Sequence, residues 1–299
     1  MPKSVRFPKH LDNGRFLVED KDKLGEGCFG AVFLGTDTRT KNKVAVKFED
    51  SNCGAPGSLV MEAQLLKKLA EPSLPQGFVE VFFFGKLGSF TCLVMDRLGK
   101  CLEDCMEDCR GKMEAKTVVL IAQQALRRLE YLHSKGVVHR DIKPENFMWG
   151  VDGKIHHLYI IDFGLSEAYW SRRHICMTTK NSMVGTARYA SISTHKGINQ
   201  TRRDDLEALA HMLIYFLRGA LPWSGLKGAK TEQEKYRMIG DRKESTPVAS
   251  LCADMHGCFA FLLTYARSLP FAERPDYEKL CVDLRRFRIQ LQSFVSGGL

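Results

Sequence analysis

The residues with the clearest chemical potential lie in "HRDIKPENF", residues 139–147. Asp141, Lys143 and Asn146 follow one another there in a loop, directly after a long predicted helix. A carboxylate can accept a hydroxyl proton, a lysine can neutralise charge on a transferring phosphoryl group, and an asparagine can bind Mg²⁺. Sixteen residues after Asn146, "IIDFG" places Asp162 at the end of an apolar strand as a second oxygen ligand. These residue types in this order predict phosphoryl transfer from a Mg²⁺-bound triphosphate.

A glycine-rich stretch upstream could cover the phosphates. In "LGEGCFGAV", residues 24–32, the glycines have G-x-G-x-x-G spacing and lie between two predicted strands. This placement favours a hairpin over phosphates, because a dinucleotide-binding fold uses the same glycines before a helix. A simple glycine-rich turn is the other interpretation. The nucleotide contacts predicted in this stretch are Leu24, Gly25, Glu26, Gly27, Cys28, Phe29, Gly30, Ala31 and Val32.

Lys47 ends the apolar run "VAVK" on the third predicted strand. A lysine in such a strand is costly to bury unless a carboxylate pairs with it. Glu62, on the helix predicted next, is the obvious partner, and the pair would direct the ammonium group at the α- and β-phosphates of a nucleotide. A solvated lysine on a strand face is the alternative, which the glycine-rich stretch upstream disfavours.

The elements that must position these residues change character near residue 99. Before it, runs rich in β-branched and aromatic residues predict five strands, with one helical stretch at 58–70. After it, helical periodicity dominates, at 115–136, 203–219, 254–268 and 276–292. The pattern predicts a small strand-rich lobe followed by a larger helical lobe, and a cleft between lobes is a natural ligand site.

Together these motifs resemble the protein kinase family over nearly the whole chain, from about Arg15 to Ser293. The presence of a lysine, Lys143, two residues after Asp141 resembles the pattern of the serine/threonine class. Within that class the chain resembles casein kinase 1, with "SIS" at 191–193 where most kinases have Ala-Pro-Glu. The matching stretches are "LGKCLED" (98–104), "GTARYAS" (185–191), "QTRRDDLEAL" (200–209) and "LPWSGLK" (221–227).

The resemblance implies an α+β fold of the bilobal protein-kinase type. Its small N-terminal lobe would hold a five-stranded antiparallel sheet and one main helix, and its larger C-terminal lobe would be mostly helical. The implied domain limits are an N-terminal extension at 1–15, a kinase domain at 16–293 and a flexible C-terminus at 294–299. The lobes would meet at a hinge: N-lobe about 16–95, hinge 96–99, C-lobe 100–293.

The resemblance also implies a serine/threonine kinase that uses ATP and Mg²⁺. Met95 would be the gatekeeper, and Asp96 and Leu98 would offer backbone groups to adenine. Arg140 stands where many kinases grip a phosphorylated activation loop. The family generally acts without such phosphorylation, so we expect constitutive activity, although hydroxyl groups are available at Thr178, Thr179 and Ser182.

One long segment carries charge of a single sign. No Asp or Glu occurs between Glu167 and Asp204, but seven basic residues do: Arg172, Arg173, Lys180, Arg188, Lys196, Arg202 and Arg203. Casein kinase 1 enzymes favour serines and threonines downstream of a phosphorylated or acidic residue. The resemblance therefore implies that Arg188, Lys227 and Lys180 recognise a substrate phosphate or other anion. A solvated surface or a nucleic-acid patch are the alternatives.

The composition agrees with a globular protein that has an anionic partner. The 299 residues carry a net charge of +9 and ten cysteines. Residues 1–15 lack the apolar core of a signal peptide, so we expect reduced cysteines and a cytoplasmic location, with the nucleus also open. No apolar run approaches a membrane span. We expect a monomer acting on acidic or phosphorylated protein substrates, without a dedicated nucleic-acid module.

Three further interpretations compete with this one. A catalytically weak kinase-fold scaffold is the main alternative, although it would not need the whole set of catalytic residues. Nucleic-acid binding through the basic surface would show a steep dependence on salt. Cys101, Cys105 and Cys109 would line one face of a helix and could in principle hold Zn²⁺, but packing as small hydrophobic residues is favoured. In most kinases the arginine at the position of Arg274 pairs with the glutamate of Ala-Pro-Glu. This chain lacks that glutamate, so the partner of Arg274 is open.

Overall fold

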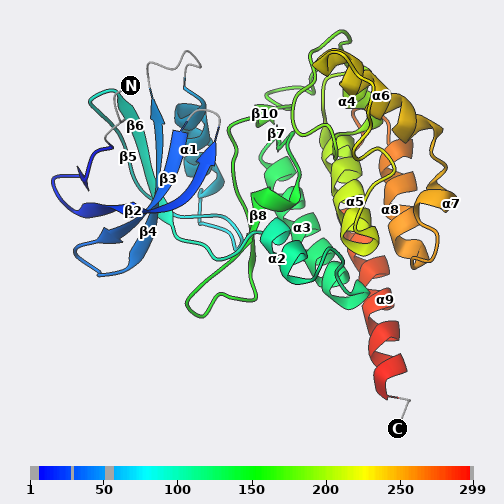
Figure 1. Ribbon diagram of the computed structural model, residues 1–299, viewed down its shortest axis with the longest axis horizontal. Helices are drawn as coiled ribbons and strands as arrows, with labels where there is room; N and C mark the ends of the chain where they lie inside the picture. The colour runs from blue at the N-terminus through cyan, green and yellow to red at the C-terminus, as the bar shows by residue number, and fades with distance from the viewer. Residues whose placement is uncertain (1–6, 28–29, 51–56, 297–299) are drawn as a thin grey trace. The chain divides into compact units, whose positions relative to one another are not determined.

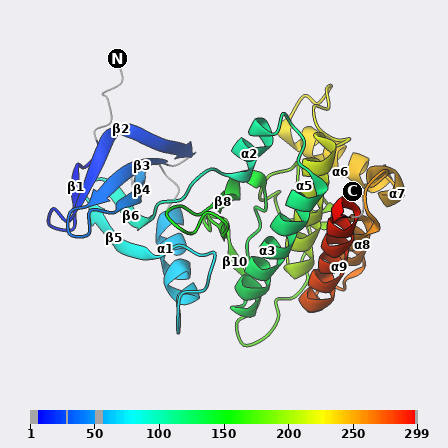
Figure 2. The same ribbon diagram turned by 90° about the horizontal axis from the view of Figure 1, so that it is seen from below.

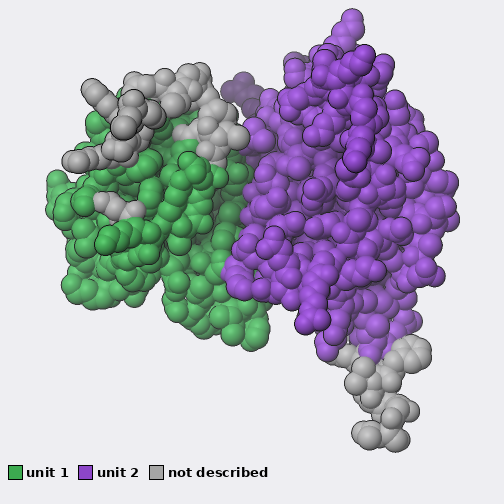
Figure 3. Space-filling model, viewed as in Figure 1, with its two compact units in different colours: residues 1–99, 148–164 green, residues 100–147, 165–299 purple. Residues whose placement is uncertain are grey.

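The computed structural model describes residues 7–27, 30–50 and 57–296. The chain divides into two compact units, which Figure 3 colours separately. The first contains residues 1–99 and 148–164, and the second contains residues 100–147 and 165–299. The first unit thus includes a segment of about 17 residues that lies well beyond residue 99 in the sequence.

The first unit is built on a six-stranded antiparallel sheet with the strand order β1-β2-β3-β4-β6-β5 (Figure 2). Five of its strands were predicted from the sequence: β2 (Phe16–Gly27), β3 (Gly30–Asp37), β4 (Lys43–Asp50), β5 (Val81–Leu87) and β6 (Phe90–Asp96). The sixth, β1 (His10–Leu11), lies in the predicted N-terminal extension and pairs with the start of β2. Leu11 is 2% exposed, so this extra strand adds a side chain to the core.

Alternating residues of the strands form the core of this unit. Side chains from β1 to β4 and β6 meet in one cluster, which includes Phe16, Phe33, Phe48 and Phe90. Helix α1 (Ser58–Leu69) packs against β5 and β6 with Leu59, Leu66 and Leu69 buried. A separate two-stranded sheet pairs β8 (Phe147–Trp149) with β9 (Leu158–Ile160).

The second unit is mainly helical. Its long helices pack in the pairs α3–α5, α3–α9, α5–α8 and α8–α9, and Figures 1 and 2 show them side by side. The longer helices are α3 (Ala115–Ser134), α5 (Arg202–Arg218), α6 (Glu232–Ser245), α8 (Gly257–Ser268) and α9 (Tyr277–Ser296). The short elements are α2 (Leu102–Asp108), η1 (Pro144–Asn146), α4 (Ile192–His195), α7 (Val248–Leu251), and the paired strands β7 (Val137–Val138) and β10 (Glu167–Ala168).

Helix α5 is the central element of this unit. It begins with a capping box between Thr201 and Asp204 and ends at Gly219, whose φ of 83° is left-handed. Thirteen of its seventeen residues are buried, in agreement with the predicted buried helix. Helix α6 was not predicted, because only Ile239, Gly240 and Lys243 are buried on it and its sequence shows no apolar stripe.

Among the described residues, no helix is both long and apolar enough to cross a membrane.

Candidate active site

The glycine-rich stretch joins two paired strands, as predicted. Gly25 lies opposite Val32, and Gly27 lies opposite Gly30. A Cβ atom on Gly30 would lie 1.7 Å from the carbonyl oxygen of Phe48, so only glycine lets β3 approach β4 at this point. Leu24, Glu26 and Ala31 belong to the same two strands, whereas Cys28 and Phe29 lie outside the described residues.

Lys47 forms the predicted ion pair with Glu62. Its Nζ lies 2.7 Å from Glu62 Oε2 and 3.1 Å from Asp162 Oδ1, all within the first unit. Burial lowers the pKa of Lys47, but the two carboxylates outweigh it and hold the pKa above its usual value. Lys47 is therefore a fixed ammonium group held beside the predicted metal ligand Asp162.

Glu49 places helix α1 at the right position for this pair. It lies two residues after Lys47 on β4 and is 6% exposed. Its carboxylate accepts the Ser58 hydroxyl and, at 3.3 Å, the backbone N–H of Leu59, so it caps the helix. One strand thus holds the lysine and anchors the helix that carries Glu62. Glu49 stands nine residues before Ser58 in the sequence, which gives no sign that its carboxylate caps the helix.

The predicted gatekeeper and hinge residues lie at the end of β6 and directly after it. Met95 and Asp96 are its last two residues. The N–H of Asp96 donates to the Glu80 carbonyl at 3.1 Å, so it is not available to a ligand. Within the part of the chain that the structure describes, the backbone of Leu98 makes no hydrogen bond. The backbone groups of Leu98 therefore have no backbone partner there, and their contact with adenine stays a prediction.

The predicted catalytic loop lies in the second unit, where three residues supply four donor groups to the carboxylate of Asp141, which is 6% exposed. Its Oδ1 accepts the N–H of Thr186 at 2.8 Å and the Thr186 hydroxyl at 2.7 Å. Its Oδ2 lies 2.8 Å from Lys143 Nζ and 3.3 Å from Asn146 Nδ2. Asn146 also donates to the Asp141 carbonyl at 2.8 Å, which leaves its Oδ1 as the atom to offer a cation. Thr186 lies in the "GTARYAS" stretch but was not predicted as a site residue.

Asp205 of α5, which is 1% exposed, anchors the backbone of this loop. Asp205 accepts the N–H groups of His139 at 2.7 Å and Arg140 at 2.9 Å, and it bonds His133 Nε2 at 2.8 Å. Burial would raise the Asp205 pKa, but these donors, His133 first, hold it below its usual value. Arg140 takes a left-handed φ of 69° here, which these bonds stabilise.

Gly185 lets the segment containing Thr186 approach the catalytic loop. Its φ is 90°, and a Cβ atom there would lie 2.1 Å from the Arg140 carbonyl oxygen. A side chain at this position would therefore push Thr186 away from Asp141.

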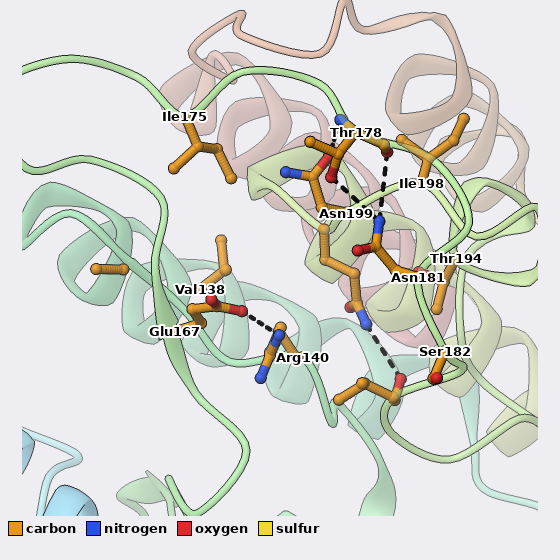
Figure 4. Close-up of a pocket in the computed structure, with 13 residues that line it drawn as sticks. Val138, Arg140, Glu167, Ile175, Thr178, Asn181, Ser182, Thr194, Ile198 and Asn199 are labelled. Atoms are coloured by element: carbon orange, nitrogen blue, oxygen red, sulfur yellow. Dashed lines mark hydrogen bonds and ion pairs between the residues drawn. The ribbon is translucent and has the colours of Figure 1, made fainter.

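Arg140 is already paired within the chain. Strand β10 pairs with β7 and sets Glu167 opposite Val138, two residues before Arg140. The guanidinium pairs with Glu167 through Nη1 and donates through Nε to the Leu165 carbonyl at 2.6 Å. Figure 4 shows this pair beside a pocket of about 340 Å³, whose lining also includes Thr178 and Asn181.

The three predicted anion-binding residues all belong to the second unit, but the structure does not join them by any contact. Arg188 is exposed, and its Nη1 lies 3.4 Å from the Tyr189 hydroxyl. Lys227 and Lys180 are both exposed. No carboxylate among the described residues forms an ion pair with any of them. Figure 4 labels Asn181 and Thr178 in the pocket lining, but Lys180 is not part of that lining.

Three other basic residues of the acid-free segment have internal partners instead. Lys196 pairs with Glu244 at 2.6 Å. Arg202 donates to the Tyr169 hydroxyl and to the Ala272 carbonyl, and Arg203 donates to the Leu269 carbonyl. These contacts engage three of the seven basic side chains of the segment, so fewer of them are open to a ligand than its sequence suggests. Arg274 is exposed and forms no ion pair with a described residue.

The oxygen donors of Asn146 and Asp162 suit Mg²⁺, which prefers hard oxygen ligands. These two residues belong to different units. Among the described residues there is no cluster of three or more His, Cys, Asp or Glu side chains that could hold a metal alone. Cys101 instead caps α2 by accepting the Asp104 N–H.

The order of these features is a glycine-rich hairpin, a lysine–glutamate pair, a catalytic loop and a further acidic residue after a short strand. A family model described as "Protein kinase domain" matches residues 18–265. The chain belongs to the protein kinase family.

Proposed function

We propose that the protein is a serine/threonine kinase of the casein kinase 1 type, which transfers the γ-phosphate of Mg²⁺-ATP to acidic or phosphate-primed proteins. The observation that carries this proposal is the set of donors around Asp141. Lys143, at 2.8 Å, reaches the same carboxylate that would receive the hydroxyl proton. A lysine at this position agrees with the serine/threonine class.

The chain's own residues divide the work of transfer. Thr186 occupies Oδ1 of Asp141 with two donors, so Oδ2 is the oxygen that would accept an incoming hydroxyl group. A substrate hydroxyl would replace the weaker donor, Asn146, at 3.3 Å and pass its proton to Oδ2. Lys143 and Lys47 would balance charge on the phosphates, and bound Mg²⁺ would supply further charge neutralisation through Asn146 and Asp162.

Recognition of an acidic or phosphorylated residue is assigned to Arg188 and Lys227, with Lys180 as a third basic residue. Support comes from the exposure of all three side chains and from the lack of an ion pair on any of them within the described chain. The guanidinium of Arg188 lies 5.8 Å from the rings of both Tyr189 and Tyr215, which limit its motion while leaving donors exposed. A phosphate accepts two parallel bonds from such a group.

Constitutive activity is supported by the pair between Arg140 and Glu167. In kinases that require phosphorylation of the activation loop, a new phosphate supplies the anion that orders the segment. Here a carboxylate of the same chain already contacts the guanidinium. No added phosphate is then needed to neutralise Arg140.

Transfer to three matched peptides tests the proposal. They carry phosphoserine, aspartate or alanine three residues before the target serine. We expect the phosphoserine peptide to be preferred, and the preference to fall roughly 10- to 100-fold when Arg188→Ala and Lys227→Ala are combined. Arg172→Ala is the control, because Arg172 is exposed and lies in the same acid-free segment. Equal rates on the three peptides would reject primed recognition but keep the kinase.

A further inference from the structure

Four consecutive backbone carbonyls, Ala187 to Ala190, accept hydrogen bonds from side chains outside their segment. We call these residues the clamped segment. Lys243 Nζ bonds the carbonyl oxygens of Ala187 at 2.8 Å and Ala190 at 2.5 Å. Between them, Trp223 Nε1 donates to the Arg188 carbonyl at 2.7 Å and His211 Nδ1 bonds the Tyr189 carbonyl at 2.8 Å. These residues belong to no helix or strand, and side chains satisfy their carbonyl groups instead.

Lys243 is an unusual residue to find at this place. It lies on the polar helix α6, yet its side chain is completely buried. It forms no ion pair with a carboxylate of the described chain; its third neighbour is His195 Nε2 at 3.2 Å, and its Nζ lies 5.3 Å from the Trp223 ring centre. Burial lowers the Lys243 pKa well below its usual value. A buried lysine without a carboxylate is costly, and an apolar residue would be a more stable choice if only packing mattered.

Gly240 lets α6 lie close enough for Lys243 to contact the clamped segment. A Cβ atom on Gly240 would lie 2.8 Å from His195 Cβ, so glycine lets α6 pack tightly against α4. Lys243 lies one turn further along α6, and its side chain extends to the clamped segment.

The clamped segment connects the catalytic carboxylate with the proposed phosphate-binding residue. Thr186, directly before it, donates twice to Asp141. Arg188 is two residues further on, which is at most about 7 Å along the chain. The carbonyls on both sides of Arg188 are held by one amino group, and its own carbonyl is held by Trp223. The direction of the Arg188 side chain relative to Asp141 therefore depends on these bonds.

We propose that Lys243 is a positioning residue for substrate selection: by holding the carbonyls of Ala187 and Ala190, it fixes the distance and direction between Arg188 and Asp141. A peptide whose phosphate is bound by Arg188 then presents its serine at Asp141. This inference rests on the proposed recognition of phosphate by Arg188. It adds the residue that sets the register between the phosphate and the acceptor hydroxyl.

A merely structural lysine would behave differently. Its loss would reduce stability and slow transfer to every peptide by the same factor. A positioning lysine acts through Arg188, so its loss should change the choice between peptides, and only while Arg188 is present.

The test is a double-mutant cycle on the full chain, using Lys243→Met, Arg188→Ala and both together, with the phosphoserine and alanine peptides as probes. We expect Lys243→Met to lower the ratio of kcat/KM for the phosphoserine peptide over the alanine peptide by roughly tenfold, mainly through KM for the phosphoserine peptide. In the Arg188→Ala background it should change that ratio by less than about twofold. Lys235→Met is the matched control, because Lys235 is exposed on the same helix.

Trp223→Phe provides a milder variant if Lys243→Met does not fold. It keeps an aromatic ring under Lys243 but removes the donor to the Arg188 carbonyl, and it should lower the same ratio in the same Arg188-dependent way. An equal loss on both peptides, or a loss of the ratio that persists without Arg188, would overturn the proposal. If Arg188→Ala alone left the ratio unchanged, the proposed phosphate recognition would fail first, and the role of Lys243 with it.

Discussion

Replacing Glu62 with glutamine should weaken the use of ATP without unfolding the protein. Glu62 is 2% exposed, and its carboxylate is 2.7 Å from Lys47 Nζ. Breaking a buried ion pair typically costs about 3–5 kcal/mol. Here the cost should be smaller, about 1–2 kcal/mol, because Lys47 keeps Asp162 at 3.1 Å and the glutamine oxygen can still accept a hydrogen bond.

The effect on catalysis should exceed the effect on stability. With one carboxylate removed, Lys47 is drawn toward Asp162, so both the phosphate-binding group and the proposed metal ligand move from their working positions. Losing one charge-assisted bond of about 1.5–3 kcal/mol corresponds to a fall in kcat/KM for ATP of roughly 10- to 150-fold.

The assay is the initial rate at varied ATP and saturating peptide, with the melting temperature measured in parallel. Glu80→Gln is the matched control, because Glu80 is an exposed glutamate of the same unit. If Glu62→Gln kept kcat/KM for ATP within about twofold of the wild type while remaining folded, the assigned role of the Lys47–Glu62 pair would be wrong.

Three further outcomes are expected. Thr186→Val removes one donor to Asp141 at 2.7 Å but keeps the shape and the backbone donor, so kcat should fall roughly tenfold in rate assays with little change in KM for ATP. The wild type should stay active after complete dephosphorylation. Glu167→Ala should have a lower rate of transfer, and added sulfate should restore part of it by supplying an anion to Arg140. An equal response of both proteins to sulfate would contradict the role of the Arg140–Glu167 pair. Burial, and then the charge of Lys243, lower the pKa of His195 to about 4 from 6.5, so its contribution to stability is present above pH 6.5 and is lost as pH falls toward 4. The free energy of unfolding in urea should fall by up to roughly 3 kcal/mol over this pH range in the wild type, and by less in His195→Gln. Parallel plots of this free energy against pH for the two proteins would contradict the assignment to His195.

Much of the fold could be predicted because its elements carry local patterns. The strands β2 to β6 are rich in β-branched and aromatic residues, and α3 and α5 have apolar periodicity with Gly136 and Gly219 after their ends. β1 is only two residues long, which is too short for a pattern. α6 is mostly exposed, and a polar helix lacks the stripe that periodicity detects.

The candidate site likewise contains residues whose role could be predicted from the sequence and residues whose role could not. The Lys47–Glu62 pair could be predicted because a lysine in an apolar strand requires a nearby carboxylate. The role of Lys243 could not, because one lysine among several in a polar stretch gives no sign that it is buried. Glu167 is the last acid before the acid-free segment, but its pairing with Arg140 depends on the β7–β10 register. The use of Arg202 and Arg203 as internal donors likewise depends on tertiary packing.

The proposed serine/threonine kinase activity is tested most directly by phosphate transfer from Mg²⁺-ATP to matched serine, threonine and tyrosine peptides, each with phosphoserine three residues before the target. We predict transfer to serine and threonine but not to tyrosine by the wild type, and a loss of roughly 10²- to 10⁴-fold in Asp141→Asn. Transfer to tyrosine at a comparable rate, or an Asp141→Asn variant as active as the wild type, would contradict it.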